Sequence, residues 1–311
     1  MQTNKPKQIE RTLHLLYCPF VGLGLYGGWR GNRWLKNRIK IFKQFVVPSL
    51  LAQTNKDFVL WVSWIPEMRN NKLVQGLVAF LDTTGLKVAH TYAGVCFYDD
   101  KYPDAEAKDR LALSLHYSAS DLSAHLGECE FVLMTIQPSD DCYRSDMVER
   151  VQKVFVENKD VQAFGYRKGL IMRYATGEVA EYNPLTIPPF FTIKFKHPVF
   201  IDPYLHMQYT GPYKSHEYIA ERLKFFESYD RGFLVGTHGE NISTVFDHPF
   251  KGADLNQSIL KNFGLEGVDK LQIEVSLRKR LLRKLPHRVQ RKIRYIFGEK
   301  IWNKIYNFLR A

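Results

Sequence analysis

The chain has 311 residues, of which 45% are hydrophobic, 14% aromatic and 24% charged, which is typical of a globular protein with a sizeable core. No run of residues approaches the roughly 18 apolar positions that span a bilayer, and the polar first ten residues contain no signal-peptide core. The four cysteines (Cys18, Cys96, Cys129 and Cys142) lack metal-binding spacing, which predicts reduced thiols in a cytoplasmic protein.

The net charge of +12 is concentrated at one end of the chain. Twelve lysine and arginine residues and one acid, Glu299, lie from Arg278 to Ala311, so this tail carries +11 and the rest of the chain carries +1. The positive charge therefore belongs to the tail and not to the body of the protein.

The first half of the sequence alternates apolar runs with segments of helical spacing. Strands are predicted at 12–20, 58–64, 86–89 and 130–136. Helices are predicted at 33–53, 73–81, 105–126 and 147–157, with a kink at Pro48 in the first of them. This alternation, with continuously apolar strands, predicts a parallel sheet covered on both faces.

The second half has a different pattern. Residues 163–174 and 179–182 flank a Thr176-Gly177 turn and predict a hairpin, residues 218–229 predict a helix, and an apolar strand starts at Phe233. We therefore expect an α/β half followed by a more antiparallel half in one domain, residues 1–270, and a basic amphipathic tail, residues 271–311.

Two adjacent acids follow the strand that ends at Ile136. Asp140 and Asp141 lie where open α/β sheets bind ligands, beyond the carboxyl end of a strand. Neighbouring carboxylates are costly unless a cation pairs with them, and a divalent metal carrying a diphosphate is one such partner. The alternative is a solvated loop in which Ser145 or Asp146 caps the next helix.

Three segments of the sequence resemble the rhamnosyltransferase family of GT-A-type, family 2-like glycosyltransferases. They are Arg33-Trp-x-x-x-Arg38-x-x-x-Phe42 running into Pro48-Ser-Leu-Leu-Ala-Gln-Thr, then Ser139-Asp140-Asp141, and then His238-Gly-Glu-Asn241-Ile-Ser-Thr244. The resemblance implies a GT-A-like (nucleotide-diphospho-sugar transferase) α/β three-layer sandwich with a mixed, mainly parallel sheet. It also implies inverting transfer of a sugar from a nucleotide-sugar donor to a glycan or lipid-linked acceptor in cell-surface polysaccharide synthesis.

The same resemblance suggests roles for individual residues. From their positions alone, Arg30 or Arg33, which flank the glycine-rich loop, could contact the donor diphosphate near Asp140 and Asp141, and Asp100 could line the nucleobase. A divalent metal ion, Mn²⁺ or Mg²⁺, would bind Asp141 and His238, although Pro138 replaces the first acid of the family's Asp-Ser-Asp-Asp motif and Ile136 replaces the arginine before it. Arg38 is interpreted equally well as a surface cation and as a contact to the donor.

Glu217 is the candidate catalytic base, with Asp202 in reserve, because inverting transfer needs a carboxylate to deprotonate the acceptor. The alternatives are an ordinary first-turn glutamate for Glu217 and an unliganded loop histidine for His238.

The glycine-rich segment after the first strand leaves another class of function open. Gly22-x-Gly24-x-x-Gly27 matches a dinucleotide or S-adenosylmethionine fingerprint, but no acid follows about 20 residues later. A loop over the donor is favoured. The alternatives are a nucleotide- or S-adenosylmethionine-binding protein of another class and a degenerate, non-catalytic GT-A domain.

The tail alternates cations with apolar residues at helical spacing, interrupted at Pro286 and Gly298. This pattern favours two short amphipathic helices on an anionic membrane, which predicts a peripheral protein on the inner face. Packing on the body and nucleic-acid binding are the alternatives, and nucleic acid is not expected as a partner.

Overall fold

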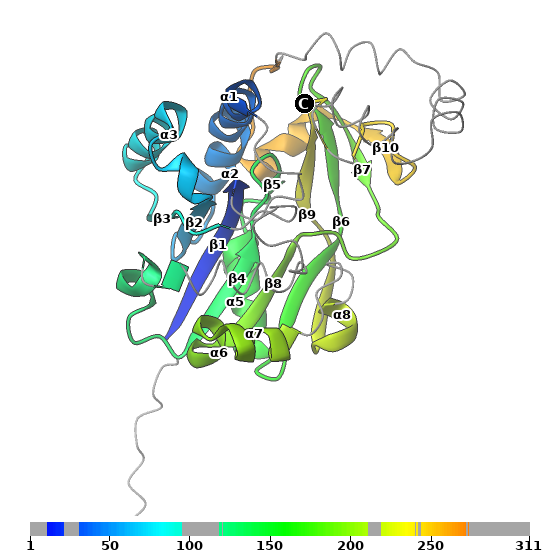
Figure 1. Ribbon diagram of the computed structural model, residues 1–311. Helices are drawn as coiled ribbons and strands as arrows, with labels where there is room; N and C mark the ends of the chain where they lie inside the picture. Colours follow the sequence, from blue (N-terminus) through cyan, green and yellow to red (C-terminus); the bar gives the residue numbers. More distant parts are fainter. Residues whose placement is uncertain are drawn as a thin grey trace, which may run out of the picture.

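A computed structural model describes residues 11–21, 31–94, 118–119, 121–210, 219–239, 241, 244–271 and 273. Its strands form one ten-stranded sheet (Figure 1). The strands are β1 (Thr12–Val21), β2 (Val59–Trp64), β3 (Val88–Thr91), β4 (Phe131–Ile136), β5 (Cys142–Tyr143), β6 (Ala163–Arg173), β7 (Glu178–Tyr182), β8 (Phe191–Lys196), β9 (Phe225–Thr237) and β10 (Lys251–Leu255).

The sheet is mixed, as predicted, and its main path runs β10-β7-β6-β8-β4-β1-β2-β3. The β3, β2, β1 and β4 strands are parallel neighbours, whereas β8 is antiparallel to β4 and β6 is antiparallel to β8 and β7. β9 pairs with β6 in parallel and with the short β5 strand in antiparallel fashion. The parallel half and the more antiparallel half were both predicted.

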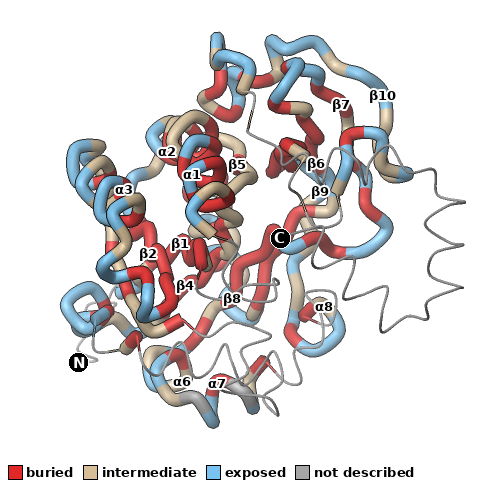
Figure 2. Tube along the Cα trace, turned by 45° about the horizontal axis from the view of Figure 1, so that its top comes forward, coloured by how far each residue is buried: buried red, intermediate tan, exposed pale blue. Residues whose placement is uncertain are grey.

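Alternating residues of the central strands face two separate cores. Leu16 and Cys18 of β1 belong to one core, and Leu15 and Tyr17 belong to the other. Helices α1 (Gly31–Ile41), α2 (Val47–Leu51), α3 (Lys72–Asp82) and α5 (Met147–Glu157) cover the first face. Residues 121–126, α6 (His197–Ile201), α7 (Pro203–Thr210) and α8 (Ile219–Arg222) cover the second. Figure 2 shows the buried strands between these helices, as expected for a three-layer sandwich.

The first predicted helix contains an irregular turn. Residues Phe42–Val46 between α1 and α2 form a π-helix, and the N–H of Val47 bonds the carbonyl of Phe42. The next residue is Pro48, which has no N–H to donate, so the irregularity lies just before the position where a kink was predicted.

The predicted helix at 218–229 is wrong beyond its first turn. α8 ends at Arg222, and β9 begins at Phe225. Residues from Phe225 onward pair with β6, so long-range strand pairing overrides the local helical pattern. Residues 105–117 of another predicted helix, and the tail after Ile273, lie outside the described residues.

The described residues also include two short 3₁₀ helices, at Pro66–Met68 and Gln257–Phe263. The second belongs to the segment that returns the chain to the body, where the N–H of Leu271 bonds the carbonyl of Tyr174 at 2.8 Å. No helix among the described residues is long and apolar enough to cross a membrane.

Candidate active site

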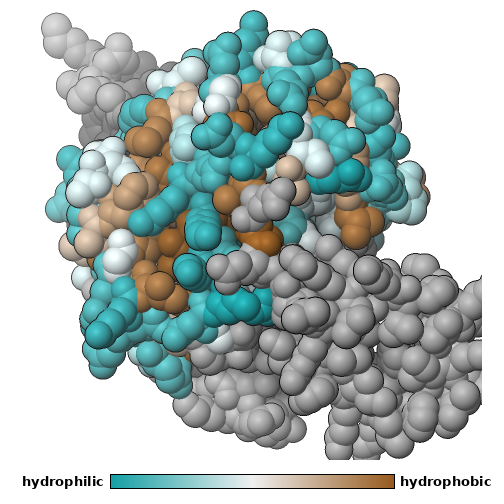
Figure 3. Space-filling model, turned by 90° about the horizontal axis from the view of Figure 1, so that it is seen from above, coloured by the Kyte–Doolittle hydropathy of each residue, from teal (hydrophilic) through white to brown (hydrophobic). Residues whose placement is uncertain are grey.

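The site lies at the carboxyl ends of β1 and β4, which point upward in Figure 1. The chain leaves β1 to build β2 and β3 on one side, and then returns to place β4 on the other side of β1. Strand order therefore reverses between β1 and β4, and in open α/β sheets the crevice at such a switch point is where ligands bind. Seen from above, this end shows hydrophobic residues between hydrophilic ones (Figure 3).

The loop after β4 is fixed at both ends. The buried Gln137 amide donates hydrogen bonds to the carbonyls of Pro138 and Asp141, at 2.8 and 3.0 Å. The Tyr143 hydroxyl donates to the carbonyl of Ile136 at 2.7 Å, and Tyr143 itself lies in β5, which pairs with β9. The loop is thus anchored rather than solvated, and Asp146 makes no capping hydrogen bond to α5.

Asp140 is the centre of a buried charge cluster. Its Oδ2 atom forms an ion pair with the Arg38 guanidinium and lies 2.9 Å from Nε2 of His238. Burial alone would raise the pKa of Asp140, but the charge of Arg38 and hydrogen bonds from His238 and Arg38 outweigh it and hold the pKa well below its ordinary value. Asp140 is therefore the ionised member of the acidic pair.

Asp141 has a different environment. Its Oδ1 accepts a hydrogen bond from the N–H of Gly236 at 2.8 Å. Burial, followed by the negative charge of Asp140, raises the pKa of Asp141 well above its ordinary value, and the hydrogen bond from Gly236 only partly opposes this. The pKa values of the two neighbouring carboxyls are thus shifted in opposite directions.

Two hydrogen bonds of Asn241 fix the chain around His238 after β9. The N–H of His238 bonds Oδ1 of Asn241 at 2.8 Å, and the Asn241 amide donates to the carbonyl of Gly236 at 2.6 Å. Gly239 has a φ of +82°, which a side chain would disfavour. The histidine of the His-Gly-x-Asn segment thus contacts Asp140, and the asparagine of the same segment bonds the histidine N–H.

Tyr174, immediately after β6, supports the same cluster. Its ring stacks on Phe45 with centroids 3.7 Å apart, and its hydroxyl donates to the carbonyl of Asp140 at 2.7 Å. Tyr174 and Asn241 were not identified as site residues from sequence. The spacing of Asn241 from His238 carried a signal for it, whereas nothing local marks Tyr174.

The prediction for Arg38 needs correction, because its side chain is only 2% exposed and is not a surface cation. Arg33 lies in the first turn of α1 and is partly exposed. Arg30, Asp100 and Glu217 lie outside the described residues, as do Gly22, Gly24 and Gly27 of the glycine-rich segment. The reserve base, Asp202, accepts hydrogen bonds from the N–H groups of Tyr204 and Leu205 at 2.9 Å, so its carboxylate caps α7.

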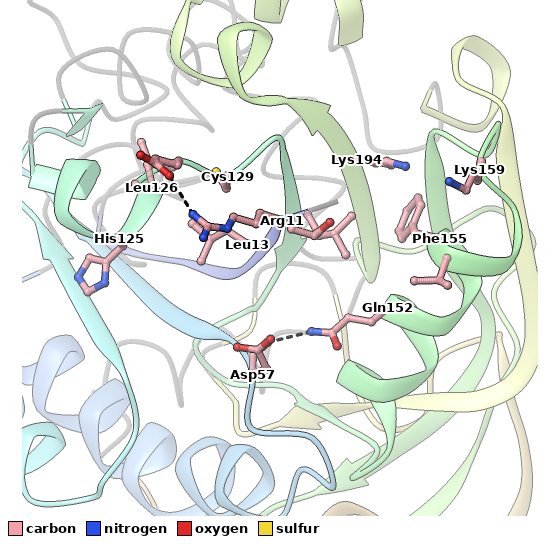
Figure 4. A pocket seen from close by; sticks show the side chains of 15 residues that line it. Arg11, Leu13, Asp57, His125, Leu126, Cys129, Gln152, Phe155, Lys159 and Lys194 are labelled. Atoms are coloured by element: carbon pink, nitrogen blue, oxygen red, sulfur yellow. Dashed lines mark hydrogen bonds and ion pairs between the residues drawn. The ribbon is translucent and has the colours of Figure 1, made fainter. Parts of the chain in front are cut away.

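Two cavities differ in their relation to this cluster. One, of about 510 Å³, lies beside His238 and is lined by residues including Arg173, Asn241, Phe246 and Leu271. A larger cavity of about 830 Å³ lies at the amino ends of β1 and β4 and is lined by residues including Arg11, Gln152 and Lys194 (Figure 4). The smaller cavity adjoins the acidic pair through His238, whereas the larger one is at the opposite end of the strands.

The donor atoms of this site do not fit a divalent metal ion as they are arranged. Asp140 faces a guanidinium, and Nε2 of His238 contacts the same carboxylate oxygen. Among the described residues, no group of three or more His, Cys, Asp or Glu side chains is arranged to hold a metal. The cation beside the carboxylates is supplied by the protein itself.

Part of the chain is similar to a known protein family. Residues 30–88 match a family model described as "Putative rhamnosyl transferase". The resemblance is confirmed over this segment. It includes Arg33, Arg38 and the Pro48-Ser-Leu-Leu-Ala-Gln-Thr run, and it supports the interpretation as a glycosyltransferase. A comparison with curated protein sequences found no match.

Several solved structures show distant likeness. Staphylococcus aureus TarS residues 1–349 in complex with UDP has 12% identity and a TM-score of 0.36, over 74% of this chain and 61% of that one. A "putative nucleotide-diphospho-sugar transferase" from Desulfovibrio desulfuricans G20 has 12% identity and a TM-score of 0.34, over 71% and 81%. A nucleoside-diphosphate-sugar pyrophosphorylase from Vibrio cholerae RC9 has 9% identity and a TM-score of 0.38, over 73% and 93%. The chain thus spans about three fifths of the length of the TarS 1–349 structure.

Proposed function

We propose that this chain transfers a sugar from a nucleotide-sugar donor to an acceptor hydroxyl, with the donor diphosphate bound between the carboxyl ends of β1 and β4. The observation that carries the proposal is the convergence of Arg38, Asp140 and His238 at the topological switch point. Three elements that are distant in sequence (α1, the loop after β4 and the end of β9) deliver these side chains to one place. The rhamnosyltransferase match over residues 30–88 supports this type of reaction.

The proposed acceptor side is the 510 Å³ cavity beside His238, whose volume lies in the range of small-molecule sites. The acceptor oxygen attacks the anomeric carbon, the bond from that carbon to the phosphate oxygen breaks, and the nucleoside diphosphate leaves. Glu217, two residues before α8, is proposed to take the acceptor proton. Inversion at the anomeric carbon follows from this single displacement. A rhamnose donor and a glycan or lipid-linked acceptor in cell-surface polysaccharide synthesis are part of the proposal.

The first test is donor binding. Purified protein is titrated calorimetrically with the common nucleoside diphosphates and their sugars, and we expect one base to bind preferentially. His238→Asn should weaken binding by about tenfold or more, the loss expected for a group that orders the charged cluster. His248→Asn is the matched control, because His248 packs against Tyr182 and Phe250 instead. No binding by any nucleotide, with the protein folded, would overturn the proposal.

Transfer itself is tested with Glu217→Gln. This variant should bind the donor like the parent protein and lose turnover by about 100-fold or more, the contribution typical of a general base. The readout is release of nucleoside diphosphate in the presence of candidate acceptors. Full turnover in Glu217→Gln would exclude this residue as the base.

A further inference from the structure

Arg38 and Asp140 form an ion pair in the interior of the site. Arg38 projects from α1 and is almost completely buried, and Asp140 is largely buried as well. A guanidinium cannot lose its proton under the conditions in which proteins fold, so this positive charge is permanent. The Arg38 plane also lies near the Trp34 ring, 5.3 Å from its centroid, one turn earlier in the same helix.

The hydrogen-bond geometry leaves little room for a metal ion on Asp140. Arg38 and His238 approach the same carboxylate oxygen, Oδ2. A ring nitrogen 2.9 Å from a carboxylate oxygen must carry the hydrogen, because two acceptors do not bond each other. The Nε2 atom of His238 is therefore a donor to Asp140 and is not available as a metal ligand in this arrangement.

The remaining carboxyl does not require a metal either. The Oδ1 atom of Asp141 accepts a hydrogen bond from the N–H of Gly236 at 2.8 Å. One carboxyl group is thus paired with Arg38 and the other with a backbone N–H. Two adjacent acids need a cation nearby, and here that cation is an arginine.

We infer that Arg38 is the resident cation of this site, occupying the position on Asp140 that a divalent metal would need, so that the donor nucleotide binds without metal. The part concerning the nucleotide rests on the proposed function, whereas the part concerning the metal does not. A divalent ion at Asp140 would meet the permanent charge of Arg38 in a buried setting, where like charges repel strongly. Removing Arg38 should let a divalent ion approach the Asp140 carboxylate, because the permanent positive charge beside Oδ2 would be gone.

The experiment measures Mn²⁺ binding to nucleotide-free protein by electron paramagnetic resonance. Wild-type protein should leave Mn²⁺ free, and Arg38→Gln should bind it about tenfold more tightly or better, with a melting temperature that rises on addition of Mn²⁺. Arg150→Gln is the control, because it removes an arginine from the partly exposed pairs with Asp146 and Asp230. It should not respond to Mn²⁺.

The second arm compares binding of the preferred nucleoside diphosphate by wild-type protein in EDTA and in Mn²⁺. Equal affinity supports the inference, and loss of binding in EDTA overturns it. Tight Mn²⁺ binding by nucleotide-free wild-type protein also overturns it, and this result needs neither a folded variant nor a nucleotide ligand. If no nucleotide binds in either buffer, the proposed function fails, while the manganese measurements still decide the role of Arg38.

Discussion

Asp140 and Asp141 are adjacent in the chain but differ in what their charge does to stability. The pKa of Asp140 is lowered, so its contribution to stability is present above the ordinary value of 3.8 and is lost as the pH falls through the folded value. The pKa of Asp141 is raised, so the unfolding free energy falls as the pH rises above 3.8. Above that pH the carboxyl ionises in the unfolded chain but stays protonated in the folded protein. The cost stops growing once the pH passes the folded pKa of Asp141.

We therefore expect opposite effects from two chemically identical substitutions. Asp141→Asn keeps an oxygen for the Gly236 N–H and should raise the unfolding free energy at pH 7 by about 1–3 kcal/mol, the cost of a poorly satisfied buried group. Asp140→Asn removes the carboxylate that pairs with the buried Arg38 and should lower the unfolding free energy by about 3–5 kcal/mol. Urea unfolding from pH 4 to 8 measures both, and the gain in Asp141→Asn should shrink toward pH 4. Equal losses in the two variants would contradict this assignment.

Some of these residues were predictable and others were not. Asp140, Asp141 and His238 follow buried strands and stand out as polar groups at strand ends. Arg38 was interpreted equally well as a surface cation, because a lone arginine in a helix usually lies in solvent. A signal was nevertheless present, since Arg38 lies three residues after Leu35 and four before Phe42, on the buried stripe of the helix. The pairing of Arg38 with Asp140, 102 positions later in the chain, cannot be predicted from local spacing.

At the scale of elements, β6 and β9 fit together through glycines that face aromatic rings. A Cβ atom on Gly236 would lie 2.2 Å from the Tyr174 ring, one on Gly232 would lie 2.1 Å from Tyr166, and one on Gly169 would lie 2.3 Å from Phe233. Each ring covers the glycine of the neighbouring strand. The local sequence from Tyr218 to Tyr229 favours a helix, but this long parallel pairing decides the outcome.

Gly236→Ala should therefore destabilise the protein. Tyr174 is held by its stack on Phe45 and its bond to Asp140, so the ring cannot withdraw, and we expect a loss of about 1–3 kcal/mol from overpacking. Gly76→Ala is the control, because a Cβ atom there meets nothing within 4 Å and the position lies inside α3. That change should gain up to about 1 kcal/mol through helix propensity. Similar losses in both variants would show that the close approach at Gly236 is not what makes glycine necessary.

At the scale of the whole molecule, strand order was the feature that the sequence predicted least directly. The alternation of elements predicts a parallel sheet, but not that β4 lies beside β1 or that β8 enters between β4 and β6. Those placements depend on contacts between distant segments, and the switch point that locates the site follows from them. The charge distribution, in contrast, is a property of the sequence alone and separates a near-neutral body from a strongly basic tail.

The tail is outside the described residues, and its role on the membrane remains a proposal with a direct test. The five cations of residues 278–284 are replaced with glutamine in the full chain. Because each cation contributes about 1 kcal/mol at an anionic surface, flotation with phosphatidylserine vesicles should fall sharply, while donor binding should be unchanged. The parent protein should dissociate as salt is raised and should not bind neutral vesicles.

The body offers a matched control for this experiment. Lys36, Lys40, Lys43 and Lys72 line a shallow basic cavity on α1, the π-helical turn and α3, remote in sequence from the tail. Changing these four lysines to glutamine removes a comparable charge without altering the tail, and vesicle binding should persist. If this variant detaches and the tail variant remains bound, then the lysines of the body contact the membrane and the tail does not. An acceptor carried on lipid would then have to approach the protein from the side of α1 and α3.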